Sequence, residues 1–143
     1  ELVVLAESLT LQEIKQPLKK LSKLILETEP VYDRIFCVNL LSIKKSEEEK
    51  LTLFFENLVS NYAPSYVRYE YFDFHEECKS NQFQNSELLV QKIKKVLDSF
   101  GVTVFDTKLK KLVGKQSGVV RTNCLDCLDR TNYMQSRIAL RQF

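Results

Sequence analysis

A cysteine and an arginine near the C-terminal end of the sequence have the spacing of a phosphate-binding loop. Five residues separate Cys124 from Arg130, and Thr131 follows the arginine directly. A turn of this length lets successive backbone N–H groups point at the oxygens of one phosphate. A helix starting near Thr131 would direct its positive end at the same point, and the guanidinium can add two parallel hydrogen bonds that lysine cannot reproduce. The expected phosphate-binding residues are Leu125, Asp126, Cys127, Leu128, Asp129, Arg130 and Thr131.

The same loop predicts a nucleophile. A cysteine at a helix N-terminus beside an arginine can have a pKa of roughly 3.5–7.5, so we expect the thiol of Cys124 to be largely ionised at neutral pH. Thr131 is expected to donate its hydroxyl to this thiolate. The chemistry would be in-line attack on phosphorus, a phospho-cysteine intermediate and hydrolysis by water. Asp126 and Asp129 are candidates to protonate the leaving oxygen. No metal or other cofactor is needed, because backbone N–H groups and Arg130 supply the positive charge.

A zinc deaminase is one rival interpretation. Those enzymes combine His-x-Glu with Cys-x-x-Cys, and residues 75–77 together with residues 124–127 supply both patterns. However, Asn123 stands where the deaminases place a proline, and Arg130 is left without a role. A structural zinc site would need Cys78 as a further ligand.

Two other interpretations also place a phosphate group in this loop but assign the loop a different function. A binding module would hold the ligand without turnover, whereas the intact Cys124, Asp126 and Arg130 favour catalysis. A protein-tyrosine phosphatase usually has a histidine before the cysteine and glycines in the loop, and this loop has neither. Within the loop, Cys127 could form a protective disulfide with Cys124 under oxidation or simply pack.

Composition narrows the class of protein. The 143 residues carry a net charge of +2, with 44% hydrophobic and 28% charged residues, which is typical of a globular domain and too weakly basic to predict nucleic-acid binding. We find no run of 18 apolar residues and no secretory signal, so the chain itself is expected to be soluble. The four cysteines indicate a reducing, cytosolic setting, with Cys37 as a buried inert thiol.

The elements that must position the loop alternate between helix and strand. Helices are expected over residues 8–27, from Ser46 to residues 62–64, from Asn85 or Ser86 to Gly101, and from about Thr131 to Phe143. Strands are expected over residues 34–41, 66–74 and 119–120, with a hairpin formed by residues 102–105 and 112–113. In the second helix, Ser46 is expected to be the cap, and the expected apolar face is Leu51, Phe54, Phe55, Leu58 and Val59. We predict an α/β fold with a mixed sheet flanked by helices, as an incomplete cysteine-phosphatase-like catalytic domain.

Residues 121–132, which read RTNCLDCLDRTN, resemble the signature of the Sac-family phosphoinositide phosphatases at every fixed position. Residues 72–79 are similar to a second stretch of the family members of the endoplasmic reticulum and Golgi, and residues 35–41 fit the same layout. The resemblance covers residues 31–143. It implies that residues 1–143 are part of a Sac-type catalytic domain, without the N-terminal non-catalytic module and the C-terminal membrane anchor of such enzymes.

The resemblance also implies a substrate. Sac-family enzymes remove phosphates from the inositol ring of membrane phosphoinositides without metal, and the Sac1-type members favour monophosphates such as phosphatidylinositol 4-phosphate. Cys124 would be the nucleophile, Arg130 the phosphate binder and Asp126 the general acid, while Asp129 would order the loop. The partner would be the lipid headgroup at the cytosolic face of the endoplasmic reticulum, Golgi or another endomembrane; no nucleic acid is expected, and protein partners are open. Supporting roles are open to Asn123, His75 and Lys79, for which a structural histidine and a solvated lysine are the plainer alternatives.

Overall fold

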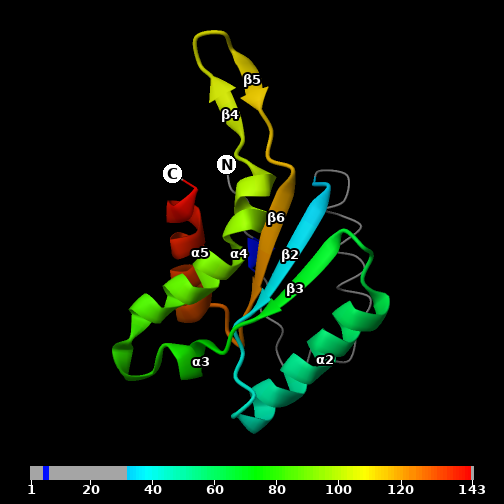
Figure 1. Cartoon of the computed structure of the whole chain (residues 1–143), viewed down its shortest axis with the longest axis vertical. Helices are drawn as coiled ribbons and strands as arrows, with labels where there is room; N and C mark the ends of the chain where they lie inside the picture. Colours follow the sequence, from blue (N-terminus) through cyan, green and yellow to red (C-terminus); the bar gives the residue numbers. More distant parts are fainter. Residues whose placement is uncertain (1–4, 7–31, 143) are drawn as a thin grey trace.

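A computed structural model describes residues 5–6 and 32–142, so the helix expected over residues 8–27 lies outside the described residues. The strands are β1 (Leu5–Ala6), β2 (Arg34–Asn39), β3 (Val67–Tyr71), β4 (Val104–Asp106), β5 (Lys111–Gly114) and β6 (Gly118–Asn123). The helices are α2 (Ser46–Tyr62), α3 (Phe74–Glu77), α4 (Ser86–Phe100) and α5 (Asp129–Arg141), with 3-10 turns η2 (Lys79–Asn81) and η3 (Phe83–Asn85). Each strand and helix expected within residues 32–142 is present (Figure 1).

Within the described residues, the main sheet has four strands in the order β1-β6-β2-β3, and every pair among them is parallel. The antiparallel hairpin β4-β5 forms a separate sheet. The expected mixed sheet is therefore wrong, because the hairpin does not join the main sheet, whereas the α/β class is confirmed. The short strand expected at residues 119–120 is the start of β6, a six-residue strand between β1 and β2 that is buried along its whole length.

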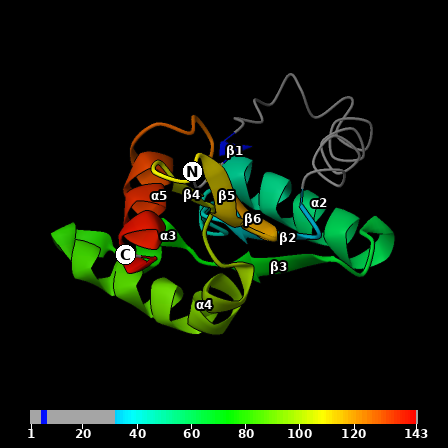
Figure 2. The same ribbon diagram turned by 90° about the horizontal axis from the view of Figure 1, so that it is seen from above.

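The two central strands bury both of their faces, which explains their apolar sequences. Side chains alternate between the faces. Ile35 and Cys37 of β2 pack towards α2 with Phe55 and Leu58. Their neighbours Phe36, Val38 and Leu40 join the larger cluster under α4 and α5. Figure 2 shows the resulting layers, with α2 on one side of the sheet and α4 and α5 on the other.

The first residue and the buried face of helix α2 differ from the expected ones. Ser46 is the first helical residue instead of the cap, and Lys45 at the cap position makes no side-chain capping hydrogen bond. The buried positions are Glu48, Leu51, Thr52, Phe55 and Leu58. Phe54, expected on the buried face, is exposed at 36%. Buried polar residues thus occupy two positions of the helix face that we expected to be apolar.

The strand expected over residues 66–74 ends early, at Tyr71, because Asp73 caps the next helix. Asp73 Oδ1 accepts the backbone N–H of Glu76 at 3.0 Å, so Phe74 becomes the first residue of α3. The helix expected to end at Gly101 does so: Gly101 has φ +66°, a conformation that other residues rarely adopt.

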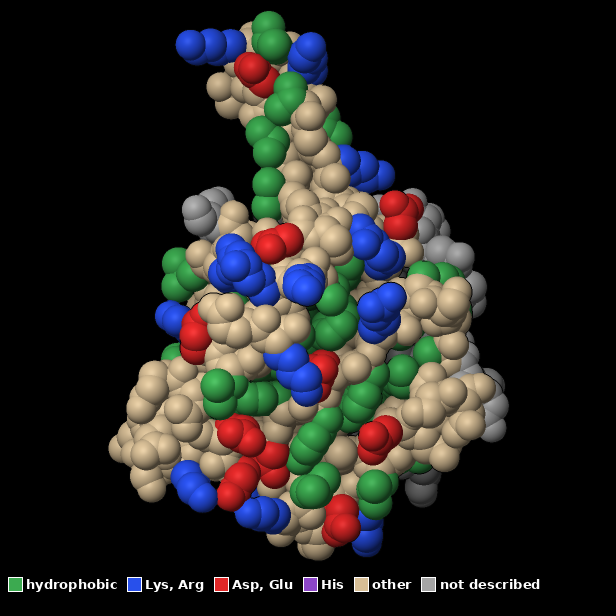
Figure 3. All heavy atoms as spheres, in the orientation of Figure 1, with side chains coloured by type: hydrophobic (Ala, Val, Ile, Leu, Met, Phe, Trp, Pro, Cys, Tyr) green, Lys and Arg blue, Asp and Glu red, His purple; other side chains and the backbone are tan. Residues whose placement is uncertain are grey.

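The hairpin β4-β5 projects from the body at the end where β6 begins (Figure 1). Its apolar side chains are exposed, among them Phe105, Leu109 and Leu112. Figure 3 shows hydrophobic and lysine side chains along this projection. Because β6 runs from this end of the molecule to the other, the hairpin and the residues that follow β6 lie at opposite ends.

Candidate active site

Cys124 lies at the carboxyl edge of the parallel sheet. It directly follows Asn123, the last residue of β6. Ligands of parallel α/β sheets bind in the crevice beyond the carboxyl ends of the strands, where the connecting loops leave the sheet. Residues 124–128 form a turn that leads into α5 at Asp129, so the positive end of that helix adjoins the turn.

The turn directs polar groups at the sulfur of Cys124. The backbone N–H groups of Leu125 and Cys127 hydrogen-bond to this sulfur. The thiol in turn lies 3.9 Å from Oδ1 of Asp126, and the same carboxylate oxygen accepts the N–H of Leu128 at 3.2 Å. Cys127 takes a positive φ of 52°, which lets the chain reverse within so few residues. The carboxylate of Asp126 thus stabilises the turn through the hydrogen bond from Leu128, and the ordering role expected of Asp129 stays a prediction.

The ionisation of Cys124 differs from the expected one. Burial raises the pKa of this thiol above its ordinary value, and the opposing effects of Arg130 and of the two N–H groups do not cancel it. Only 2% of the side chain is exposed. The expectation of a thiolate at neutral pH is therefore wrong for this arrangement, because removing the sulfur from water disfavours the charged form.

The hydroxyl of Thr131 does not reach the sulfur as expected. Thr131 is fully buried in the first turn of α5, and its Oγ1 has no hydrogen-bond partner among the described residues. Within the described part of the chain, the buried amide of Asn123 has no hydrogen-bond partner either. Buried polar atoms of this kind cost about 1–3 kcal/mol each when left unpaired. Asn123 and Thr131 flank the turn, one on each side.

Cys127 remains a thiol, as does Cys124. Its sulfur lies 3.5 Å from the carbonyl oxygen of Cys124, to which it donates. This contact agrees with a packing role for Cys127 within the loop.

Arg130 makes a buried ion pair with Glu48 of α2. Its Nη1 donates to Oε2 of Glu48 at 2.9 Å and its Nη2 to Oε1 at 3.4 Å. The backbone N–H of Ser42 also donates to Oε2, at 2.8 Å. Burial opposes ionisation of Glu48, but the hydrogen bonds from Arg130 and Ser42 outweigh it, so the pKa of Glu48 lies below its ordinary value. The carboxylate therefore stays charged against the guanidinium.

Sequence reasoning missed Glu48, although a signal was available. Residues 47–49 are three glutamates at the start of a helix, where acidic side chains are generally stabilising, so the pattern alone singles out none of them. Only Glu48 lies three, four and seven residues before the buried Leu51, Thr52 and Phe55. Helical spacing places it on the buried face, where a carboxylate needs a partner.

A cleft of about 780 Å³ opens beside the turn, between the start of α5 and the segment around α3. Six of the sequence-predicted site residues line it: Leu125, Asp126, Asp129, Arg130, His75 and Lys79. The remaining predicted residues, which are Asn123, Cys124, Cys127, Leu128 and Thr131, are not among its lining residues. The structure thus brings the two distant sequence stretches together, but Cys124 itself is buried and does not line the cleft.

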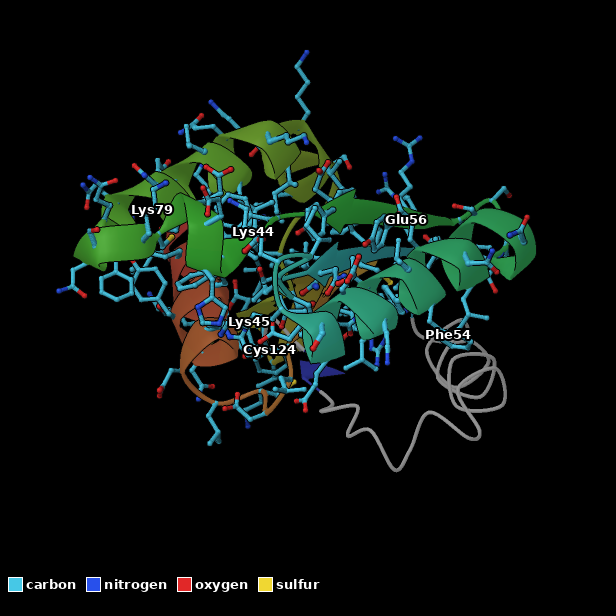
Figure 4. All side chains as sticks on the ribbon, turned by 90° about the horizontal axis from the view of Figure 1, so that it is seen from below. Lys44, Lys45, Phe54, Glu56, Lys79 and Cys124 are labelled. Carbon is cyan, nitrogen blue, oxygen red and sulfur yellow. The ribbon has the colours of Figure 1, made fainter. Side chains whose placement is uncertain are left out.

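His75 and Lys79 reach the cleft from α3 and from the turn that follows it. Nε2 of His75 lies 2.9 Å from Nζ of Lys45 and 3.8 Å from Oε1 of Glu48. Burial lowers the pKa of His75, and the positive charges of Arg130 and Lys45 lower it further, which favours a neutral ring that accepts from Lys45. Lys79 is paired with Glu76 at 3.0 Å. Figure 4 shows this end of the molecule with Lys44, Lys45, Lys79 and Cys124 labelled.

The residues required for a zinc deaminase do not form a metal site. No group of three or more histidine, cysteine, aspartate or glutamate side chains comes together as a metal-binding cluster within residues 5–6 and 32–142. His75 instead faces Lys45 and Glu48.

Comparison with known protein families shows which family the chain matches. The family described as the SacI homology domain matches residues 4–79, which is more than half of the sequence. The chain belongs to this family. The resemblance to Sac-family proteins noted from residues 121–132 and 72–79 is thereby confirmed, although the match ends before the turn that contains Cys124.

Individual relatives extend the likeness. The chain is 44% identical over 112 residues to phosphatidylinositol-3-phosphatase SAC1 of Drosophila melanogaster, which covers 78% of this chain and 18% of that protein. Identity is 37% over 134 residues to polyphosphatidylinositol phosphatase INP53 of Saccharomyces cerevisiae, covering 92% of this chain and 12% of the relative. Identity is 36% over 124 residues to phosphatidylinositol-3-phosphatase SAC1 of Saccharomyces cerevisiae, covering 79% of this chain and 19% of that protein. The chain therefore spans less than one fifth of the length of these relatives.

As far as the structure describes the chain, none of its helices is long and apolar enough to cross a membrane.

Proposed function

We propose that this chain carries the catalytic loop of a phosphoinositide phosphatase, which hydrolyses phosphate monoesters on the inositol ring through a phospho-cysteine intermediate. The observation that carries the proposal is the placement of Cys124 and Arg130. They lie at the carboxyl end of β6 and in the first turn of α5, on either side of a turn whose N–H groups point at the sulfur. Residues 1–143 would form part of a Sac-type catalytic domain with a cysteine-phosphatase-like arrangement.

In the proposed reaction, Cys124 gives its proton to the carboxylate of Asp126, whose Oδ1 lies 3.9 Å from the sulfur, and the sulfur attacks phosphorus in line with the bond to the ring oxygen. A sulfur–phosphorus bond forms while the phosphorus–oxygen bond breaks. Asp126 donates a proton to the departing ring oxygen, and Arg130 binds the phosphoryl oxygens. Water then attacks the phospho-cysteine, releasing inorganic phosphate and restoring the thiol. The site needs no metal, because the guanidinium and the N–H groups of the turn supply the positive charge.

The proposed substrate is a phosphoinositide headgroup at the cytosolic face of an endomembrane such as the endoplasmic reticulum or Golgi, with phosphatidylinositol 4-phosphate and other monophosphates preferred. Two of the relatives are named phosphatidylinositol-3-phosphatases and a third a polyphosphatidylinositol phosphatase. Their names support the lipid class, and the one ring position that they print is the 3-position, so the preference for the 4-phosphate rests on the family resemblance. The cleft of about 780 Å³ next to Arg130 has room for an inositol headgroup.

The test is phosphate release by the full chain from vesicles that each contain one phosphoinositide, alongside a soluble phosphotyrosine peptide. We expect release from the monophosphorylated lipids, little from the peptide, and the same rates with and without EDTA. Release from the peptide alone, or activity that requires a metal and disappears with EDTA, would contradict the proposal.

A second function is favoured by one observation. The thiol of Cys124 is 2% exposed and burial raises its pKa, which is what a loop that binds phosphoinositides without turnover would also have. Acid quenching of the reaction separates the two functions. A phosphatase accumulates radiolabelled phosphate on Cys124 when the substrate carries the label, whereas a binding module retains the intact lipid and no covalent label.

A further inference from the structure

The carboxylate of Glu48 contacts charged and polar groups that lie outside helix α2. It is 2% exposed, lies in the first turn of α2 and is paired with Arg130 of α5. Both residues line the cleft, and the side chain of Arg130 is the more exposed of the two, at 12%. The ion pair therefore joins a carboxylate, which repels an anionic ligand, to the guanidinium that is the proposed phosphate binder.

The geometry of the pair leaves part of the guanidinium available. Both contacts to Glu48 use Nη1 and Nη2. A guanidinium has five N–H donors in one plane, so the edge that includes Nε can still make parallel hydrogen bonds to two oxygens. A carboxylate that holds one edge fixes the plane of the group and thereby the direction in which the other edge points.

Glu48 is itself held from two further loops. The N–H of Ser42, in the loop after β2, donates to Oε2 at 2.8 Å. The hydroxyl of Ser42 donates to Oδ2 of Asp73 at 2.8 Å, and Asp73 caps α3. The loops after β2, β3 and β6 are thus linked by one chain of buried hydrogen bonds that ends on Arg130. Such a chain is rigid because each of its members would be left unpaired if it moved.

The charges around Glu48 support the same role. Nζ of Lys45 lies 3.7 Å and Nε2 of His75 3.8 Å from Oε1, in addition to the pair with Arg130. Without Arg130, the remaining contacts to Lys45 and to the N–H of Ser42 would compensate this buried charge less well, which is unfavourable. The guanidinium is therefore kept in place before a ligand arrives, and the ligand does not have to order it.

We propose that Glu48 is the positioning residue of Arg130: it holds one edge of the guanidinium so that the other edge is oriented towards the phosphoryl oxygens in the cleft. This inference rests on the proposed phosphatase function. It predicts that loss of the Glu48 carboxylate weakens phosphate binding and turnover through Arg130, without contact between Glu48 and the substrate.

The test compares Glu48→Gln with two control variants in the full chain. Glu49→Gln removes the next, exposed charge, and Thr52→Val removes a buried hydroxyl on the same face of α2 that accepts from Asn39. The readouts are kcat and KM for phosphate release, and the concentration of inorganic phosphate that half-protects Cys124 from alkylation by iodoacetamide. Alkylation is carried out at alkaline pH, because burial raises the pKa of Cys124, and is followed at this residue by peptide mass spectrometry to separate it from Cys127. We expect Glu48→Gln to lower kcat/KM by about 10²-fold, as for a misplaced catalytic group, and to raise the protecting phosphate concentration. Both control variants should keep the wild-type values.

A double-mutant cycle separates positioning from a structural role. If Glu48 acts through the guanidinium, Glu48→Gln should have no further effect on phosphate protection in an Arg130→Lys background. Additive losses would overturn the inference, as would wild-type values for Glu48→Gln or an equal loss in Thr52→Val. Glu48→Asp, which keeps the charge but shortens its reach, provides the same test where Glu48→Gln does not fold, and wild-type values for it would also overturn the inference.

The two readouts distinguish this inference from the proposed function. If the wild-type chain releases no phosphate from any phosphoinositide but inorganic phosphate still protects Cys124, the phosphatase proposal fails while the effect of Glu48→Gln on protection still decides the positioning role. If wild type shows neither release nor protection, both proposals are wrong.

Discussion

Two neighbouring places in the parallel sheet each bring a cysteine against an arginine, and only one of them adjoins a cleft. In the middle of the sheet, Cys37 of β2 lies in register with Arg121 of β6, and both are buried. The guanidinium of Arg121 lies 5.8 Å from the centre of the Phe55 ring. At the carboxyl edge, Cys124 follows the same strand β6, and Arg130 lines the cleft while it is paired with Glu48.

The difference between the two places comes from where the strand ends. Within a parallel ladder the backbone N–H groups bond to neighbouring strands, so none is left for the thiol of Cys37. Burial raises the pKa of Cys37 to about 11 in spite of the nearby charge of Arg121. Beyond the end of β6 the backbone is free to turn, and the N–H groups of Leu125 and Cys127 reach the sulfur of Cys124. The pKa of both thiols is raised by burial, so what distinguishes Cys124 is the backbone N–H groups that reach its sulfur after the chain leaves the sheet.

The sharpest test of this comparison is substitution of each of the two cysteines by serine. Cys124→Ser should lower phosphate release by at least about 10³-fold, because a hydroxyl is a far weaker nucleophile at neutral pH. Cys37→Ser should leave kcat unchanged and reduce the free energy of unfolding by about 1–3 kcal/mol, because it buries a hydroxyl. Phosphate-release kinetics and urea unfolding measure the two effects. Activity in Cys124→Ser would refute the mechanism.

Substitution of each of the two arginines by lysine tests the next largest effect. Arg130→Lys should reduce kcat/KM by roughly 10²–10³-fold, since lysine offers no bidentate contact to the phosphoryl group. Arg121→Lys should retain kcat/KM and lower the melting temperature, because the stack on Phe55 is lost. Steady-state kinetics and thermal unfolding distinguish them. Equal losses of activity would mean that Arg130 acts through stability alone.

The two aspartates of the turn should differ. Asp126→Asn is expected to slow the chemical step by about 10²-fold, the lower end of the range for loss of a general acid, and Asp129→Asn much less. Single-turnover rates with a substrate that has a poor leaving group provide the measurement. Because Asp126 also accepts the N–H of Leu128, the asparagine variant keeps that hydrogen bond while it removes the acid. Equal effects of the two substitutions would leave neither as the sole acid.

The smallest effect concerns pH and stability. The pKa of Cys37 is raised in the folded state from 9.0 to about 11. A raised pKa means that the folded state holds the proton more tightly than the unfolded state does. The contribution of Cys37 to the free energy of unfolding is therefore complete below pH 9 and is lost as the pH rises through about 11. Urea unfolding at a series of pH values should therefore show a decline over this window that is shallower in Cys37→Ala. An identical decline in the variant would contradict the burial argument.

Local sequence determined much of this protein. Apolar runs with β-branched residues predicted β2 and β6, and Gly101 marked the end of α4. The spacing of Cys124 and Arg130 predicted a turn between a strand and a helix, and the structure has that turn, because strand ends and helix starts depend mainly on nearby residues. The motif within residues 121–132 also indicated the family to which the chain belongs.

Only the tertiary structure decided how those pieces meet. The parallel order β1-β6-β2-β3 brings the loops after three strands to one edge, which no local pattern could reveal. Glu48 lies 82 residues from Arg130 in the sequence and became its partner through the packing of α2. The raised pKa of Cys124 has the same origin: charge and spacing favoured a thiolate, but burial depends on what the rest of the chain places over the sulfur.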